Sequence, residues 1–202
     1  MNTPHLYLAS QSPRRQALLE QIGIQYVLLL PDSQEEADAL EQAHDHESAH
    51  TYVQRVARCK ADAALQRRLQ QRLPALPILC ADTIVALDDS ILGKPHDAHT
   101  AYTMLQRLSG STHQVLTALV LIAQNGRPYS AYCASTVQLR PLQEAEIHRY
   151  IASGEPFGKA GAYAIQGRAA EFVQHISGSH SGIMGLPLFE TSALLRQAGV
   201  IF

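Results

Sequence analysis

The sequence has few charged residues, few cysteines and no long apolar run, and each shortage excludes a class of protein. Charged residues make up 17% and hydrophobic residues 46% of the 202 residues, which favours one substantial core over a disordered chain. The three cysteines form no CxxC pair, and their odd number argues against a complete disulfide framework. The most apolar run, Val115 to Ala123, is far shorter than the roughly 20 residues that span a bilayer.

The charge balance and the N-terminus narrow the range of partners and locations. A net charge of −2 without an evident basic patch argues against a general nucleic-acid binder. The first ten residues lack the charged start and the apolar stretch of a signal peptide. We therefore expect a cytoplasmic protein that binds neither nucleic acid nor a membrane.

Several well-known catalytic and metal-binding motifs are also absent. The chain has no GxxxxGK[ST] phosphate loop and no GxSxG nucleophile elbow. His44, His46 and His50 lie close together, but they lack HExxH spacing and a cysteine pair. This pattern argues against a structural zinc site.

The hydrophobic pattern predicts strands and helices in irregular alternation. We expect strands within 5–10, 24–30, 77–89, 113–123, 130–140 and 170–177, and helices within 13–23, 47–69, 96–110, 142–152 and 187–199. Asn125-Gly126 is typical of a hairpin turn, so the sheet contains antiparallel pairs. With no repeat and no linker, we expect a single α/β domain over residues 1–202 with a mixed sheet.

The segment SQSPRR places two arginines where a strand ends and a helix begins. Ser12 is suited to cap that helix and Pro13 to occupy its first position. Positive side chains are unfavourable there unless an anion compensates them. Arg14 and Arg15, with the hydroxyls of Ser10 and Ser12, therefore indicate either a phosphate site or a capped helix with two solvated arginines.

Polar residues also interrupt two apolar patterns. Lys60 falls on the apolar stripe of its predicted helix, where it must reach the rim, pair with a carboxylate or contact a bound anion. Asp82 and Thr83 interrupt a buried strand. A buried carboxylate is costly unless a metal ion, a lysine or a catalytic water accompanies it, or unless it bonds backbone groups at a bulge. Lys94 follows the next turn and could return toward Asp82.

Two loops carry further candidate residues. The glycine-rich stretch GKAGAYAIQG contains Gln166, whose amide can donate to and accept from a base edge, although an ordinary long turn has the same composition. The acidic stretch after the second strand offers Glu35 and Glu36 as oxygen ligands for magnesium. Most carboxylates of such a loop are simply solvated.

Taken together, these stretches resemble the Maf family of nucleotide pyrophosphatases. The matches run nearly end to end, from LASQSPRRQALLEQIG through VARCKA, ADTIV, LGKP and GKAGAYAIQG to GSHSGIMGLPLFET. The resemblance implies an elongated Maf/ITPase-like α/β fold, in which helices flank a mixed sheet and a substrate cleft lies between two lobes. It also implies a homodimer.

The resemblance further implies hydrolysis of a nucleoside triphosphate to the monophosphate and pyrophosphate, with Mg²⁺ or Mn²⁺ as cofactor. Asp82 would be the proton acceptor that activates water, and Glu35 and Asp82 would hold the metal. The phosphate-binding residues would be Ser10, Ser12, Arg14, Arg15, Lys60 and Lys94.

The substrate subclass follows from three positions of the same resemblance. Members that act on dTTP and UTP carry Thr after the aspartate and AYxIQG in the loop, as here with Thr83 and Gln166. Together with Arg14, these are the implied specificity residues. Members that act on 7-methyl-GTP typically carry a glutamine after the aspartate and an acidic residue before the last glycine of the loop. A 7-methyl-GTP pyrophosphatase of the same family is therefore the first alternative function. A non-catalytic nucleotide sensor linked to septum formation and a protein-binding module that uses the acidic loop are the others.

Overall fold

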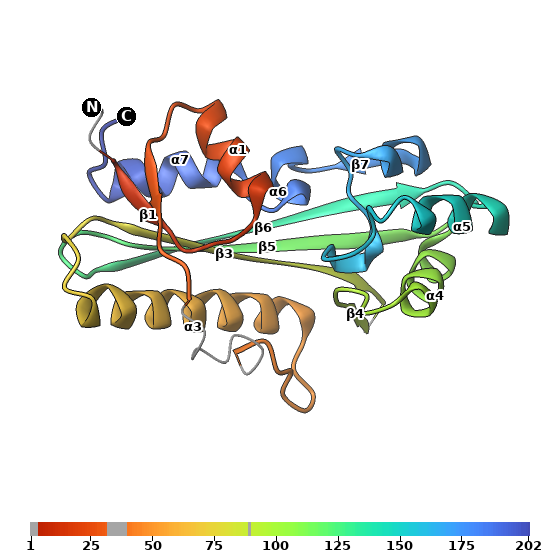
Figure 1. Ribbon diagram of the computed structural model, residues 1–202, viewed down its shortest axis with the longest axis horizontal. Coiled ribbons are helices and arrows are strands. Elements are labelled where there is room, and N and C mark those ends of the chain that lie inside the picture. Colours follow the sequence, from red (N-terminus) through yellow and green to blue (C-terminus); the bar gives the residue numbers. More distant parts are fainter. Residues whose placement is uncertain (1–3, 32–39, 89) are drawn as a thin grey trace.

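The computed structural model describes residues 4–31, 40–88 and 90–202, and it shows one continuous sheet with helices packed on both faces (Figure 1). The predicted residues Glu35 and Glu36 lie outside these described ranges. The strands are β1 (Leu6–Leu8), β2 (Tyr26–Leu28), β3 (Ile78–Leu87), β4 (Ser90–Leu92), β5 (Thr112–Ile122), β6 (Pro128–Leu139) and β7 (Val173–Ser177). The helices are α1 (Pro13–Gln21), α3 (Ala49–Gln70), α4 (Ala98–Leu108), α5 (Glu144–Ala152), α6 (His180–Met184) and α7 (Leu188–Gln197), with short 3₁₀ turns η1 (Ala160–Ala162) and η2 (Arg168–Phe172).

The sheet is mixed, as the sequence predicted. Its strands follow the order β2-β1-β3-β5-β6-β7. Strand β1 runs parallel to both β2 and β3, while β3, β5, β6 and β7 pair antiparallel in succession. The hairpin between β5 and β6 turns at Asn125-Gly126, where Gly126 adopts a φ of 83° that suits glycine.

One edge of β3 is only partly covered by neighbouring strands. Strand β5 pairs with the other edge over nearly its whole length, from Ile78 to Ala86. On the open edge, β1 reaches only Leu79, and β4 begins to pair at Val85. Within the described ranges, no strand pairs with residues 80–84 on that edge. Asp82 and Thr83 lie in this gap.

The helices divide the molecule into two lobes, which Figure 1 shows at opposite ends of the long strands. One lobe contains α1, α3 and α7, and we call it the near lobe. In it, α3 covers one face of the sheet and α1 and α7 cover the other. Alternate β3 residues enter the two cores, with Cys80 and Ile84 facing α3 and Leu79 and Ala81 facing the opposite side. By the same alternation Asp82 lies on the α3 side.

The far lobe consists of β4, α4, α5, η1, η2 and β7 around a separate core. Helix α4 begins where the sequence predicted, because the Asp97 carboxylate accepts a hydrogen bond from the Thr100 backbone N–H at 2.6 Å. The short elements β4 and α6 were not predicted, because they are three and five residues long and too brief to show a periodic pattern. In the described part of the chain, no helix combines the length and apolar character needed to span a membrane.

Candidate active site

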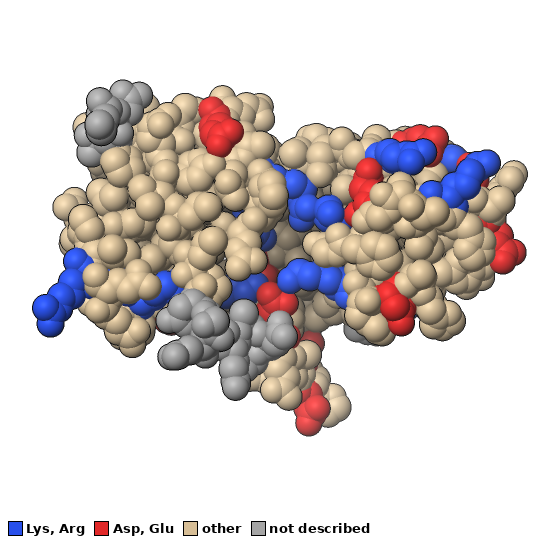
Figure 2. Space-filling model, viewed as in Figure 1, with Lys and Arg blue, Asp and Glu red and all other residues tan. Residues whose placement is uncertain are grey.

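A cleft of about 600 Å³ lies between the two lobes, within the range of small-molecule sites. Figure 2 shows lysine and arginine side chains, with an acidic group among them, gathered in the hollow between the lobes. Every predicted site residue that the structure describes lines this cleft: Ser10, Ser12, Arg14, Arg15, Lys60, Asp82, Thr83, Lys94 and Gln166. The topology therefore brings together segments that are far apart in the sequence.

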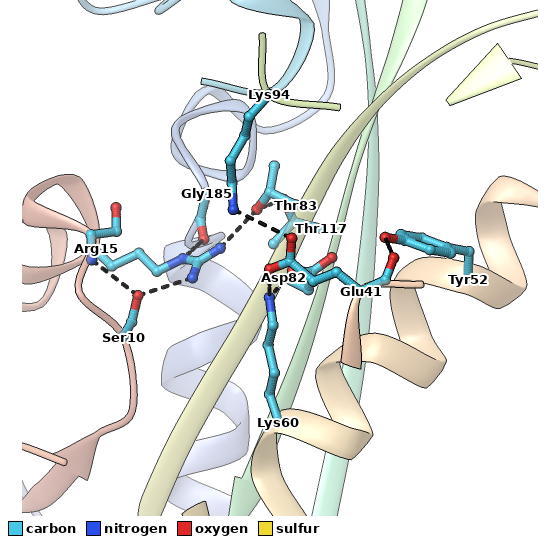
Figure 3. A network of polar contacts seen from close by, with 11 residues as sticks. Ser10, Arg15, Glu41, Tyr52, Lys60, Asp82, Thr83, Lys94, Thr117 and Gly185 are labelled. Atoms are coloured by element: carbon cyan, nitrogen blue, oxygen red, sulfur yellow. Dashed lines mark hydrogen bonds and ion pairs between the residues drawn. The ribbon is translucent and has the colours of Figure 1, made fainter. Parts of the chain in front are cut away.

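The centre of the cleft is a lysine held between two carboxylates (Figure 3). The Lys60 ammonium lies 2.6 Å from Asp82 Oδ1 and 2.6 Å from Glu41 Oε1. Burial alone would lower the pKa of Lys60, but these two carboxylates outweigh burial and raise it. Of the roles that the sequence left open for Lys60, the structure shows pairing with a carboxylate. Asp82 is 7% exposed, and the partner that compensates for the burial of its carboxylate is this lysine.

Glu41, which the sequence did not single out, is the carboxylate that Lys94 contacts. Lys94 does not reach Asp82; its ammonium lies 3.4 Å from Glu41 Oε2. Burial raises the pKa of Glu41, but Lys60 and Lys94 lower it further, so the net shift is downward. The Tyr52 hydroxyl donates to the Glu41 carbonyl at 2.6 Å and helps to fix this residue. Glu41 belongs to the acidic stretch, where nothing local distinguished it from its neighbours.

Arg15 is more deeply engaged with the protein than the sequence suggested. Its guanidinium donates to the Gly185 carbonyl at 2.9 Å, to Ser10 Oγ at 3.0 Å and to Thr83 Oγ1 at 3.3 Å. Burial lowers the pKa of Arg15. These neutral partners come from three separate segments, so Arg15 fixes the start of α1 against β3 and the end of α6 (Figure 3). Its contact with phosphate stays a prediction.

The start of α1 carries the features of an anion site. Ser12 occupies the N-cap position and Pro13 the first helical position, as predicted. The expected capping bond is not formed: the Ser12 side chain accepts no hydrogen bond from a backbone N–H of the helix. The first turn also contains no acidic residue. The Ser12 hydroxyl and the positive helix end are therefore available to an anion in the cleft.

Thr83 occupies a fixed position within a polar chain. Its hydroxyl lies 2.9 Å from Thr117 Oγ1, and the buried Thr117 in turn donates to the Gly182 carbonyl at 2.9 Å. Because Thr83 also accepts from Arg15, its hydroxyl bonds mainly within the protein. An influence of Thr83 on specificity would therefore act through the placement of Arg15 and α6.

Gln166 is exposed on the far-lobe side of the cleft, at the end of a loop that Glu155 holds in place. The Glu155 carboxylate accepts from the Tyr150 hydroxyl at 2.9 Å and from the backbone N–H groups of Arg168 and Ala169 at 3.0 and 3.3 Å. A side chain at Gly167 would overlap this carboxyl group. These contacts fix the backbone on the C-terminal side of Gln166 while leaving its amide free to face a ligand.

A buried histidine supports the same loop. His113 on β5 is 2% exposed, and its Nε2 lies 2.8 Å from the hydroxyl of Tyr163, which lines the cleft. Among the described residues, His113 Nδ1 has no hydrogen-bond partner. Burial lowers the pKa of His113 to about 4, so the folded protein holds this imidazole neutral.

We expect this histidine to make the fold sensitive to acid. Unfolded histidine titrates near 6.5, so the stabilisation from a depressed pKa is complete above that pH and is lost as the pH falls toward 4. The loss amounts to about 3 kcal/mol. Urea unfolding between pH 7 and 4.5 measures it. His113→Gln should flatten this pH dependence, whereas the exposed His99→Gln should not; equal slopes in all three proteins would contradict the assignment.

An α/β fold, a cation-lined cleft at a gap in the central sheet and a buried carboxylate at its centre together define a protein that binds a phosphorylated small molecule. Comparison with known proteins is more specific. Residues 5–198 match the family model described as Maf-like protein. The chain belongs to the Maf family.

Curated relatives match the chain over nearly its whole length. It is 59% identical over 197 residues to the dTTP/UTP pyrophosphatase of Ralstonia nicotianae, covering 98% of this chain and 95% of the relative. It is 60% identical over 200 residues to the dTTP/UTP pyrophosphatase of Cupriavidus metallidurans, covering 99% and 100%. Among solved structures, a HAM1 protein from Coxiella burnetii is similar with a TM-score of 0.49 and 16% identity, covering 96% of this chain and 100% of that one.

Proposed function

We propose that this protein is a nucleoside triphosphate pyrophosphatase that hydrolyses dTTP and UTP to the monophosphate and pyrophosphate. The observation that carries the proposal is the Asp82 carboxylate, nearly buried in a cleft that the cationic start of α1 also lines. The relatives named dTTP/UTP pyrophosphatase, identical at more than half of the aligned positions, support the substrate assignment.

The proposed reaction uses Asp82 as general base. Asp82 accepts a proton from water as the water oxygen bonds to the α-phosphorus, and the bond from that phosphorus to the oxygen bridging to the β-phosphate breaks. The negative charge departs on pyrophosphate. Lys60 and Lys94 lie beside the carboxylates and would neutralise charge that develops on the phosphate oxygens. Positioning and charge neutralisation supply most of the rate enhancement in such reactions.

A divalent cation, Mg²⁺ or Mn²⁺, fits the residues at the centre of the cleft. Asp82 and Glu41 already bracket one positive charge, the Lys60 ammonium, at 2.6 Å each. Magnesium is commonly held by one or two carboxylates together with substrate phosphates, so Asp82 and Glu41 would hold it. When bound, it would neutralise charge on the triphosphate. The part assigned to Glu35 stays a prediction because that residue lies outside the described ranges.

Specificity for a pyrimidine is assigned to Arg14, Thr83 and Gln166. Of these, Gln166 would face the base, whereas Arg14 would act by placing the triphosphate and Thr83 through the placement of Arg15 and α6. The Gln166 amide offers one donor and one acceptor, which matches the edge of uracil or thymine. A methylated guanine presents a donor-rich, positively charged edge, for which a carboxylate at this position would be better suited. A glutamine at position 166 therefore favours dTTP and UTP over 7-methyl-GTP. The partly buried ion pair of Asp82 and Lys60 likewise favours an enzyme over a non-catalytic sensor.

The deciding experiment is pyrophosphate release from a panel of canonical and modified triphosphates, with magnesium or manganese. We expect release from dTTP and UTP and little from purine nucleotides. Activity on 7-methyl-GTP alone would overturn the specificity assignment and keep the chemistry. No release from any nucleotide despite intact binding would favour the sensor.

The assembly and location are also part of the proposal. We infer a single-domain homodimer in the cytoplasm, from the family resemblance. Light scattering on the purified protein would test the dimer, and a monomer at micromolar concentration would contradict it.

A further inference from the structure

The sequence contains only three lysines, and all three line the cleft. Lys60 and Lys94 contact carboxylates there. The third, Lys159, belongs to the glycine-rich loop and donates to the Phe157 carbonyl at 3.0 Å. Within the described ranges it forms no ion pair with a carboxylate, so its charge is the least compensated of the three.

A second cation in the same cleft shares this lack of a carboxylate. Arg14, from the opposite lobe, donates to the Met184 carbonyl at 3.3 Å and forms no ion pair within the described part of the chain. Partial burial is the largest cause that lowers the pKa of Lys159, and the positive charge of Arg14 lowers it further. The two cations therefore repel each other across the cleft that both line. Two like charges held near one another in a partly desolvated cleft favour an anion between them.

The backbone around Lys159 is fixed before any ligand binds. The Gly161 N–H donates to the Gly93 carbonyl at 3.0 Å, which ties the loop to the segment that carries Lys94. Gly161 has a φ of 67°, and a Cβ there would press against the Val85 side chain at 2.9 Å. Lys94 and Lys159 therefore extend into the cleft from two joined segments of the far lobe.

We propose that Lys159 and Arg14 together bind the β- and γ-phosphates of the substrate, the portion that leaves as pyrophosphate. This inference rests on the proposed hydrolysis of a triphosphate. Lys60 and Lys94 lie at the carboxylates, where the α-phosphorus is attacked, and so a separate cationic pair is needed for the rest of the chain of phosphates. A lysine supplies the point charge, and an arginine supplies a planar pair of donors.

The test measures binding of inorganic pyrophosphate, with magnesium, by calorimetry. Lys159→Met should weaken binding by about tenfold to a hundredfold, the usual effect of losing one charged hydrogen bond. Lys159→Arg should restore most of the affinity. Arg168→Met is the matched control, because it removes an exposed cation just after the same loop but outside the cleft lining, and it should bind like the wild type.

Binding of dTMP separates a phosphate contact from a general disturbance of the loop. We expect Lys159→Met to bind dTMP normally, and to show a KM for dTTP that rises by about tenfold while kcat falls less. Unchanged pyrophosphate affinity in Lys159→Met, an equal loss of dTMP affinity, or no pyrophosphate binding by the wild type would each overturn the proposal. Since the pyrophosphate and dTMP binding assays need no turnover, a wild type that cleaves no triphosphate but binds pyrophosphate through Lys159 would refute the proposed function alone.

Discussion

Asp82→Asn should lower turnover of dTTP by about 10²- to 10⁴-fold, the range expected when a general base is removed. Asparagine has nearly the same shape as aspartate, but its amide cannot take the proton that the attacking water must lose. The change also removes the negative charge 2.6 Å from the Lys60 ammonium, so Lys60 becomes more available to phosphate. Steady-state kinetics would give the loss of kcat, and calorimetry would show that dTTP still binds.

The control for this variant is Asp62→Asn, on the exposed side of α3. Asp62 forms a surface ion pair with Arg58 and is half exposed, so its replacement should leave kcat unchanged and stability within about 0.5 kcal/mol. If Asp82→Asn loses dTTP binding together with rate, the carboxylate is a ligand-binding or structural group. Retention of more than a tenth of wild-type turnover would also remove Asp82 from the role of general base.

Where the sequence predicted the site well, a local rule was broken. Asp82 interrupts an apolar strand, Lys60 interrupts an apolar helix stripe, and Arg14 and Arg15 place positive charge at a helix start. Each violation costs free energy unless a partner compensates it, and so each indicates a site. The structure places all of these residues in one cleft. The mixed sheet was equally predictable, because alternating apolar runs and the Asn125-Gly126 turn set its antiparallel strands.

What the sequence could not reveal depends on contacts between distant segments. Glu41 looks like any residue of a solvated acidic stretch until the fold brings it within 2.6 Å of Lys60. The partners of Arg15 include Gly185, which is 170 positions away. The gap on the open edge of β3 arises from where β1 and β4 stop pairing, and no pattern within β3 itself encodes that register. Local patterns thus identified most of the side chains, and the topology determined which of them act together.

Lys60→Met should lower turnover by about 10²-fold and move the acid limb of the pH–rate profile to higher pH. The substitution keeps most of the buried stem but leaves Asp82 and Glu41 without the cation between them. Because Lys60 is the largest influence that lowers the pKa of Glu41, its removal lets that pKa rise. With a higher pKa, Glu41 becomes protonated and loses its negative charge at a higher pH than in the wild type. Activity that requires this charge therefore begins to fall at a higher pH.

The pH profile distinguishes this electrostatic role from simple phosphate binding. Lys60→Arg keeps a positive charge between the two carboxylates, so its acid limb should stay close to that of the wild type even if longer reach reduces kcat. Measuring kcat and KM for dTTP from pH 5 to 9 in the three proteins makes the comparison. A Lys60→Met variant whose KM rises with an unmoved acid limb would show that Lys60 contacts substrate without controlling the carboxylates. A shifted limb in Lys60→Met alone would show that one lysine charge sets the protonation of the cleft before the triphosphate arrives.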